Sequence, residues 1–165
     1  LNNTDVSTFQ ALAPENNTIL TRDTHPPFWF YIPFAGSDEL RYAEFMLIHD
    51  EDQSYALGEP ILFELPEQPG LVQVQLPESF SGLESDRLYR WYFSIQCDAN
   101  ELSRNPGLSG EIERSSQVVD QRDLWPEAMM QAMNNGPSND WAEFLRNIKV
   151  NYQHPEEIVE LEITR

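Results

Sequence analysis

Alternation of apolar and polar residues dominates the middle of the chain and predicts β-strands there. The clearest case is Leu88–Cys97, in which every second residue is apolar and the residues between them are mostly polar. The apolar face of this strand consists of Tyr89, Trp91, Phe93, Ile95 and Cys97. Leu71–Leu76 and Leu108–Arg114 alternate in the same way, so we expect each to have one face in the core and one in solvent.

Further strands are expected where apolar runs are bounded by turn residues. Phe28–Ile32 is unbroken and ends at Pro33, which is typical of a strand covered on both faces. Leu40–His49 and the extended stretch Ser54–Leu65 form a hairpin around an acidic turn. Such closely spaced strands predict an antiparallel β-sandwich over residues 26–114. The polar residues before it end in two prolines and are expected to form an arm.

After residue 116 the spacing of apolar residues changes to that of helices. The first stripe comprises Trp125, Ala128, Met129, Ala132 and Met133, and the second comprises Trp141, Phe144, Leu145 and Ile148. Together they predict a C-terminal helical hairpin, a layer over residues 117–150 within a single domain of residues 1–165. The tail from Pro155 to Arg165 alternates too loosely for an assignment.

The charge of the chain limits its partners. Ten basic and 28 acidic residues in 165 give a net charge of −18, which repels nucleic-acid phosphates and anionic lipids, so we expect no nucleic-acid partner. No apolar run approaches the roughly 20 residues of a membrane span, so we expect no membrane insertion. The basic residues are arginine apart from Lys149, which suits an extracytoplasmic setting, although an acidic surface also serves solubility alone. The start at Leu1 fits either a processed secreted protein or a chain trimmed to its ordered part.

The residues before the longest strand have the spacing of a tyrosine corner. Leu83 lies six residues and the turn residue Asp86 three residues before Tyr89. In immunoglobulin-like sandwiches such a tyrosine bonds back to the backbone of the preceding crossover. This favours an immunoglobulin-like type, although a tyrosine that merely packs remains the alternative. The immunoglobulin disulfide is absent because Cys97 has no second cysteine to pair with.

Several motifs spread over most of the chain form a recognisable set. They are Pro27-Phe-Trp-Phe-Tyr-Ile-Pro33, Ala43-Glu-Phe-Met-Leu47, Leu65-Pro66, Pro69-Gly70, Leu76-Pro77, Tyr89-Arg-Trp91-Tyr-Phe-Ser-Ile-Gln-Cys97, Gly110-Glu-Ile-Glu-Arg114 and the segments around Trp125 and Trp141. This set resembles the cyanobacterial family catalogued as domain of unknown function 928. The resemblance implies a signal peptide and a periplasmic or otherwise extracytoplasmic protein. It carries over no catalytic residue.

Cys97 is the obvious candidate nucleophile, with His25, His49 or His154 as a base. Its position in the strand favours another role. Cys97 continues the apolar face of Tyr89 and Trp91, where a cysteine behaves as a small hydrophobic residue. We therefore expect Tyr89, Trp91 and Cys97 to be structural.

Asp50 and Asp52 begin like a calcium-binding loop, because such loops place oxygen ligands at alternate positions. The continuation departs from that pattern, with Tyr55 where a glycine is required and Ile61 in place of the final glutamate. The pair is therefore a weak candidate for a metal site, and a plain acidic turn is favoured. No motif for another metal or for a cofactor occurs, so we expect no cofactor.

Aromatic residues on the strand faces are the remaining candidates for ligand binding. Trp29, Tyr31, Tyr42 and Tyr92 could stack a sugar or grip a peptide. The helical layer must also cover an apolar face, and Trp29 and Tyr31 suit that purpose. A covered core is favoured over an open binding face for these two.

These observations predict a non-catalytic extracytoplasmic module that binds a protein or a glycan. The alternative is an acidic hydrolase that uses a pair of carboxylates, one of which would need a raised pKa. The pattern leaves the oligomeric state open.

Overall fold

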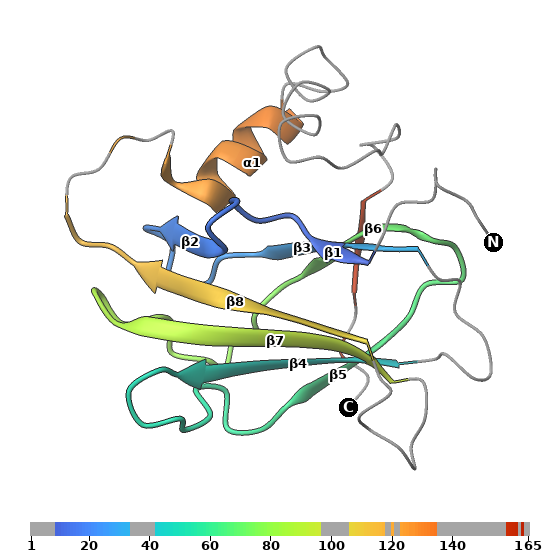
Figure 1. The fold of residues 1–165 in the computed structure, drawn as a ribbon, viewed down its shortest axis with the longest axis horizontal. Coiled ribbons are helices and arrows are strands. Elements are labelled where there is room, and N and C mark those ends of the chain that lie inside the picture. The colour runs from blue at the N-terminus through green and yellow to red at the C-terminus, as the bar shows by residue number, and fades with distance from the viewer. Residues whose placement is uncertain are drawn as a thin grey trace.

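The computed structural model describes residues 9–33, 42–96, 106–117, 120, 123–134, 158–161 and 163. Within these ranges the protein is mainly β, with two packed sheets and one short helix (Figure 1). This arrangement confirms the expectation of a β-sandwich at the level of fold class.

The smaller sheet has four strands in the order β1-β3-β6-β9, and the larger has five in the order β2-β8-β7-β4-β5. The smaller sheet comprises β1 (Gln10–Ala11), β3 (Phe28–Ile32), β6 (Gly70–Val74) and β9 (Val159–Glu160). The larger sheet comprises β2 (Thr18–Thr21), β4 (Tyr42–His49), β5 (Ile61–Glu64), β7 (Leu88–Gln96) and β8 (Gly107–Arg114). The strands predicted from the apolar pattern are therefore present, with small shifts at their ends. The long arm predicted for Ser54–Leu65 is shorter, because only Ile61–Glu64 forms a strand there.

The N-terminal arm predicted for the first 25 residues is wrong where the structure describes it. Both β1 and β2 lie in this segment, and each belongs to a different sheet. The sandwich therefore extends beyond the predicted limits of 26–114, and β9 extends it again near the C-terminus. The segment looked like an arm because its strands are two and four residues long, too short to show alternation.

The prediction of an antiparallel sandwich needs a correction at two edges. β2 pairs with β8 in parallel, and so does β9 with β6. The remaining strand pairs are antiparallel. Both parallel strands reach their partners over long stretches of chain, which parallel neighbours require because a tight hairpin cannot join them.

The core lies between the inner faces of the two sheets. β7 shows strict alternation, with Tyr89, Trp91, Phe93 and Ile95 buried and the residues between them partly exposed. Across the core, the ring of Phe30 stacks on that of Phe93 with 4.0 Å between centroids, and its edge approaches Trp91 at 5.6 Å. Burial of these large aromatic rings supplies the main driving force for packing the sheets.

The helix α1 (Trp125–Asn134) covers the outer face of the four-stranded sheet. Met129 and Ala132 of its apolar stripe pack on Trp29 and Leu71, so the first predicted helix is confirmed. The second helix of the predicted hairpin, at Trp141–Ile148, lies outside the described residues.

A polar clasp fixes the start of α1 to the end of β2. The Thr21 hydroxyl, which is fully buried, donates to the Glu127 carboxylate at 3.1 Å, and the Arg22 N–H donates to it at 2.9 Å. The same hydroxyl accepts from the Asp23 N–H at 3.0 Å. Because the buried polar groups are satisfied, the clasp carries little desolvation cost.

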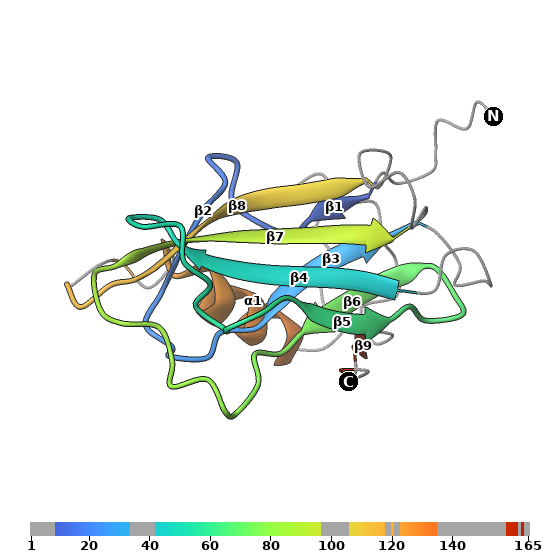
Figure 2. The ribbon, with the colours of Figure 1, turned by 90° about the horizontal axis from the view of Figure 1, so that it is seen from below.

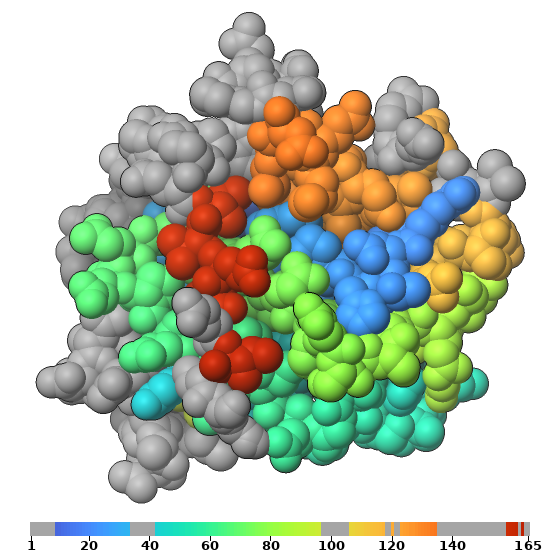
Figure 3. Space-filling view, turned by 180° about the vertical axis from the view of Figure 1, so that it is seen from behind, coloured from blue at the N-terminus to red at the C-terminus, as the bar shows by residue number. Residues whose placement is uncertain are grey.

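The C-terminal tail joins the two sheets. β9 pairs with β6, the Leu161 N–H donates to the Gln73 carbonyl at 2.8 Å, and Ile163 forms a bridge to Phe63 of β5. Leu161 is 4% exposed and belongs to the sandwich core. The space-filling view shows the tail, in red, against the green segments of β5 and β6 (Figure 3). The described residues of this tail, 158–161 and 163, are therefore part of the sandwich.

Candidate functional site

Two of the four candidate aromatic residues are covered by α1. Trp29 is 2% exposed, packs with Leu71 and Met129, and donates from its indole N–H to the Gln73 side-chain oxygen at 2.9 Å. Tyr31 borders the same cluster and is partly buried. Trp29 therefore lies in a covered core, the alternative favoured for it from the sequence, and Tyr31 lies at the border of that core.

The other two candidates, Tyr42 and Tyr92, face outward from the five-stranded sheet. Tyr42 is 37% exposed and Tyr92 is partly exposed. Tyr92 is paired with Met46, whereas Tyr42 is paired with Gln96, four residues further along β7. Four residues of strand span about 14 Å, so the two tyrosines share a face without touching. Figure 2 shows this sheet in front of α1, which lies behind it.

A row of polar side chains crosses the same outer face. The Arg90 guanidinium contacts Glu111 at 2.9 Å and Asp50 at 3.4 Å, and the Thr18 hydroxyl donates to Glu111 at 3.1 Å. Arg90 is directly opposite Glu111 in the register of β7 and β8, and Thr18 is directly opposite Glu111 in that of β2 and β8. The charged groups are about one-third exposed, so each ion pair contributes little, and the row mainly fixes the orientation of the side chains.

Small residues separate the row from the far tyrosine. Ser94 and Gly107 are paired, and Ser109 lies opposite Tyr92. A Cβ atom added at Gly107 would meet its nearest neighbour, the Ser94 Cβ, at 3.6 Å, which is ordinary contact. Gly107 is exposed, and a Cβ atom is accommodated there without a clash.

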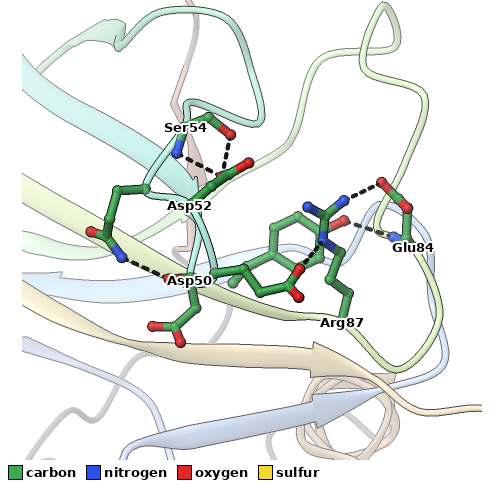
Figure 4. Close-up of polar contacts among 8 residues, drawn as sticks. Asp50, Asp52, Ser54, Glu84 and Arg87 are labelled. Carbon is green, nitrogen blue, oxygen red and sulfur yellow. Dashed lines mark hydrogen bonds and ion pairs between the residues drawn. The ribbon is translucent and has the colours of Figure 1, made fainter.

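Asp50 and Asp52 do not form a common oxygen cluster. Asp52 accepts from the Ser54 hydroxyl at 2.6 Å and from the Ser54 N–H at 3.0 Å, whereas Asp50 contacts Arg90. Figure 4 shows the two carboxylates pointing away from each other. The hydrogen bonds from the Ser54 hydroxyl and N–H lower the pKa of the Asp52 carboxyl. Among the described residues no group of three or more histidine, cysteine, aspartate or glutamate side chains could hold a metal ion.

The neighbouring crossover is tied to the same turn. The Arg87 guanidinium contacts Glu84 at 2.9 Å and Glu51 at 3.4 Å (Figure 4). The Glu84 N–H donates to the Tyr89 hydroxyl at 2.8 Å. This last bond is the contact that defines a tyrosine corner, as the spacing before Tyr89 predicts.

The two other residues predicted to be structural differ in outcome. Trp91 is 1% exposed, and its ring lies over Gly110, where an added Cβ would approach the indole to 2.5 Å. Trp91 therefore lies in the core, and Gly110 is the partner that the sequence did not indicate. Cys97 lies outside the described residues, so the prediction that it is structural stays a prediction.

The carboxyl groups whose pKa is displaced bear on the hydrolase alternative. The pKa of Asp86 is lowered by hydrogen bonds from the Ser116 hydroxyl and N–H, just as that of Asp52 is lowered by Ser54. Both groups are held ionised, which is the opposite of what a general acid needs. Neither therefore supports catalysis by a carboxylate pair.

Sequence reasoning missed two surface features that the structure assembles. One is the row of Thr18, Glu111 and Arg90. The alternating pattern in the sequence does not indicate that these side chains contact one another. The other is a groove between the β5–β6 turn and the C-terminal tail, lined by residues that are far apart in the chain. Register and tail placement, which determine both features, leave no local signal in the sequence.

Comparisons with known proteins add a family to this description. Among the described residues, no helix has the length and apolar character that crossing a membrane requires. No curated protein and no solved structure matches the chain. The family model described as Domain of Unknown Function (DUF928) matches residues 2–122, which include both sheets except β9. The chain therefore belongs to the DUF928 family.

Proposed function

We propose that this protein is a non-catalytic binding module that holds a protein or glycan partner on the outer face of its five-stranded sheet. The observation that carries the proposal is the difference between the two outer faces. The four-stranded sheet has its aromatic residues, Trp29 above all, packed under α1. The five-stranded sheet has Tyr42, Tyr92 and Met46 on outward positions that are at least partly exposed.

The chemistry of this face suits recognition. Tyrosine offers a large rigid ring with a polar end, which can stack a sugar or cover an apolar side chain at low cost in conformational entropy. The row of Arg90 and Glu111 next to Tyr92 supplies oriented donors and acceptors. A flat sheet with aromatic and polar groups resembles protein interfaces more than a catalytic cleft.

We further propose that the sandwich is of the immunoglobulin-like type. In support, β1-β3-β6 matches the A-B-E order of such domains, and β8-β7-β4-β5 matches G-F-C-C′. The tyrosine corner also lies at the start of β7, the position of strand F. β9 takes the place of strand D but comes from the C-terminal tail.

We also propose a cyanobacterial origin and a periplasmic or secreted location. The support is the resemblance of the sequence motifs to a family with those properties, together with the acidic, lysine-poor composition. Fractionation of cells that express the full-length gene tests the location. Recovery of the protein only from the cytoplasm would contradict it.

The binding face can be tested by blocking it. Gly107→Trp places a large side chain on the exposed outward position at the start of β8, opposite Ser94, and Glu78→Trp adds the same side chain at an exposed position outside both sheets. Both variants and the unmodified protein would be compared on a glycan array and against a panel of extracellular proteins. For any partner that shows saturable binding, we expect Gly107→Trp to lower the affinity at least about tenfold, or about 1.4 kcal/mol. Glu78→Trp should leave that affinity unchanged.

Two results would contradict the proposal. A partner held equally well by Gly107→Trp must bind elsewhere. A glycan that the protein cleaves would show an enzyme instead of a binding module. Thermal melts of both variants check that the added tryptophan has not unfolded the sheet.

A further inference from the structure

Two exposed apolar side chains lie close together on the C-terminal tail. Five large hydrophobic side chains are exposed in the described part of the chain. Two of them, Val159 at 46% and Ile163 at 44%, are four residues apart on this tail. An exposed apolar pair on one short segment marks this edge of the sandwich as a candidate interaction surface.

Val159 and Ile163 border a groove of about 450 Å³ between the β5–β6 turn and the tail. The groove is lined by Glu64, Leu65, Pro66, Glu67, Val159, Glu160, Leu161 and Ile163. Leu65 and Leu161 are buried and form its floor, since both belong to the core between the sheets. The groove therefore has a fixed apolar base and does not depend on side chains that must first become ordered.

The rim of the groove is uniformly acidic. Glu64 and Glu67 lie on the sandwich side and Glu160 on the tail side, and no basic residue is among the described side chains that line it. The Glu67 and Glu160 carboxylates, on opposite sides of the groove, have the same charge and therefore repel each other. The chain as a whole carries −18, which adds long-range attraction for a cation.

We propose that this edge groove is a docking site for a basic, apolar segment of a partner protein, in which lysine or arginine residues accompany aliphatic ones. The aliphatic side chains lie against Leu161, Val159 and Ile163, and the basic groups pair with the acidic rim. The charge of the rim selects this occupant over an acidic or purely apolar segment. The groove is separate from the outer face of the five-stranded sheet, and the inference does not rest on that face.

Docking also affects the tail itself. A cation between Glu67 and Glu160 removes the repulsion that opposes the contact of the tail with the sandwich. The hydrogen bond from the Leu161 N–H to Gln73 then opens less often. Hydrogen exchange at the Leu161 amide therefore reports on occupation of this groove and not on general attraction of cations to an acidic protein.

The test uses a short capped peptide that alternates lysine and leucine. Two control peptides replace either every leucine with serine or every lysine with glutamine. We expect saturable binding of the lysine–leucine peptide by NMR titration, with shifts centred on Val159, Leu161 and Ile163 and slower exchange of the Leu161 amide. We expect both control peptides to bind at least about threefold more weakly, since each lacks one of the two contributions.

Matched variants separate the groove from the overall charge. Glu67→Gln/Glu160→Gln removes two charges from the rim, and Glu15→Gln/Glu78→Gln removes two exposed charges elsewhere. The first variant should lower the affinity for the lysine–leucine peptide about three- to tenfold. The second variant should leave this affinity nearly unchanged. Equal losses in both variants, equal binding of the serine peptide, or shifts centred away from the tail would each overturn the proposal.

Discussion

At the level of single residues, the Tyr89 hydroxyl connects the crossover before β7 to the strand that it begins. Its partner is the backbone N–H of Glu84 at 2.8 Å, and the ring itself is 1% exposed. Removing the hydroxyl leaves this N–H without its partner at a part-buried position, while the ring continues to fill the core. Tyr89 therefore contributes to the free energy of unfolding in two separable ways, through the hydrogen bond of its hydroxyl and through the packing of its ring.

Tyr89→Phe should therefore lower the free energy of unfolding by about 1–2 kcal/mol. Tyr92→Phe, which removes a hydroxyl from the outward face of the same strand, should change it by less than about 0.5 kcal/mol. Urea unfolding of both variants measures the difference. An unchanged midpoint for Tyr89→Phe would mean that the tyrosine corner does not contribute to stability.

Gly110 and Gly107 lie three residues apart in β8 and face opposite sides of the sheet. A Cβ atom at Gly110 would lie 2.5 Å from the Trp91 ring, whereas at Gly107 it would be 3.6 Å from its nearest neighbour. Gly110→Ala should lower the free energy of unfolding by about 1–3 kcal/mol because it overpacks the core. Gly107→Ala should be neutral or slightly stabilising, because alanine loses less backbone entropy on folding. Equal effects of the two changes in thermal melts would contradict this account of Trp91.

Asp86 adopts a left-handed backbone conformation with φ of 60° and accepts hydrogen bonds from the Ser116 N–H and hydroxyl. Its lowered pKa means that the folded state favours the ionised carboxyl. The stabilisation is therefore fully present above the ordinary pKa of aspartate, about pH 4, and is lost as pH falls through the lower folded-state value.

Asp86→Asn keeps a residue that tolerates this conformation but removes the charge. We expect the variant to melt below the unmodified protein at neutral pH and the two melting temperatures to converge below about pH 4. Glu78→Gln, which removes an exposed charge, serves as the control. A gap between Asp86→Asn and the unmodified protein that persists at pH 2 would show that the effect is not electrostatic.

At the level of elements, sequence periodicity worked where an element is long and buried on one face. β7 and α1 were predicted because nine and ten residues provide several repeats of an apolar spacing. β1 and β9 have two residues each, so their placement depends on pairing partners that are distant in the chain. The four-residue strand β2 was missed for the same reason, and alternation would not have given its direction, since it reads the same in parallel and antiparallel strands.

The candidate site was predictable to a smaller extent. The sequence identified Trp29, Tyr31, Tyr42 and Tyr92 as aromatic residues on strand faces, but only register and the position of α1 decide which face stays open. The edge groove had no sequence signal, because its two walls come from residues 64–67 and 159–163. Local pattern identifies which residues point outward, and tertiary packing determines which of them meet.

At the level of the whole molecule, charge is the dominant property. A net charge of −18 on one small domain favours expansion through like-charge repulsion, and added salt screens that repulsion as the Debye length falls from about 30 Å at 0.01 M to about 3 Å at 1 M. The melting temperature should therefore rise with sodium chloride. A flat profile in a salt series would show that local pairing with arginine already compensates the acidic surface.

Divalent cations extend this prediction to the acidic turn. Because Asp52 bonds to Ser54 and Asp50 contacts Arg90, the turn has no preformed ligand cage. Calcium should raise the melting temperature no more than magnesium at the same concentration. A selective shift with calcium at millimolar concentration or below would contradict the assignment of these residues to a plain turn.

The parallel pairing of β2 with β8 also determines how the molecule resists mechanical force. Residues 18–21 lie beside residues 111–114 in the same direction, so the segment entering β2 and the segment leaving β8 depart from opposite ends of the pair. Tension applied through those two segments slides the strands past each other and loads all their hydrogen bonds together. In an antiparallel pair pulled the same way, the bonds would break one after another. Under tension applied at those two points, this edge of the larger sheet would therefore resist as a pair of strands loaded in shear.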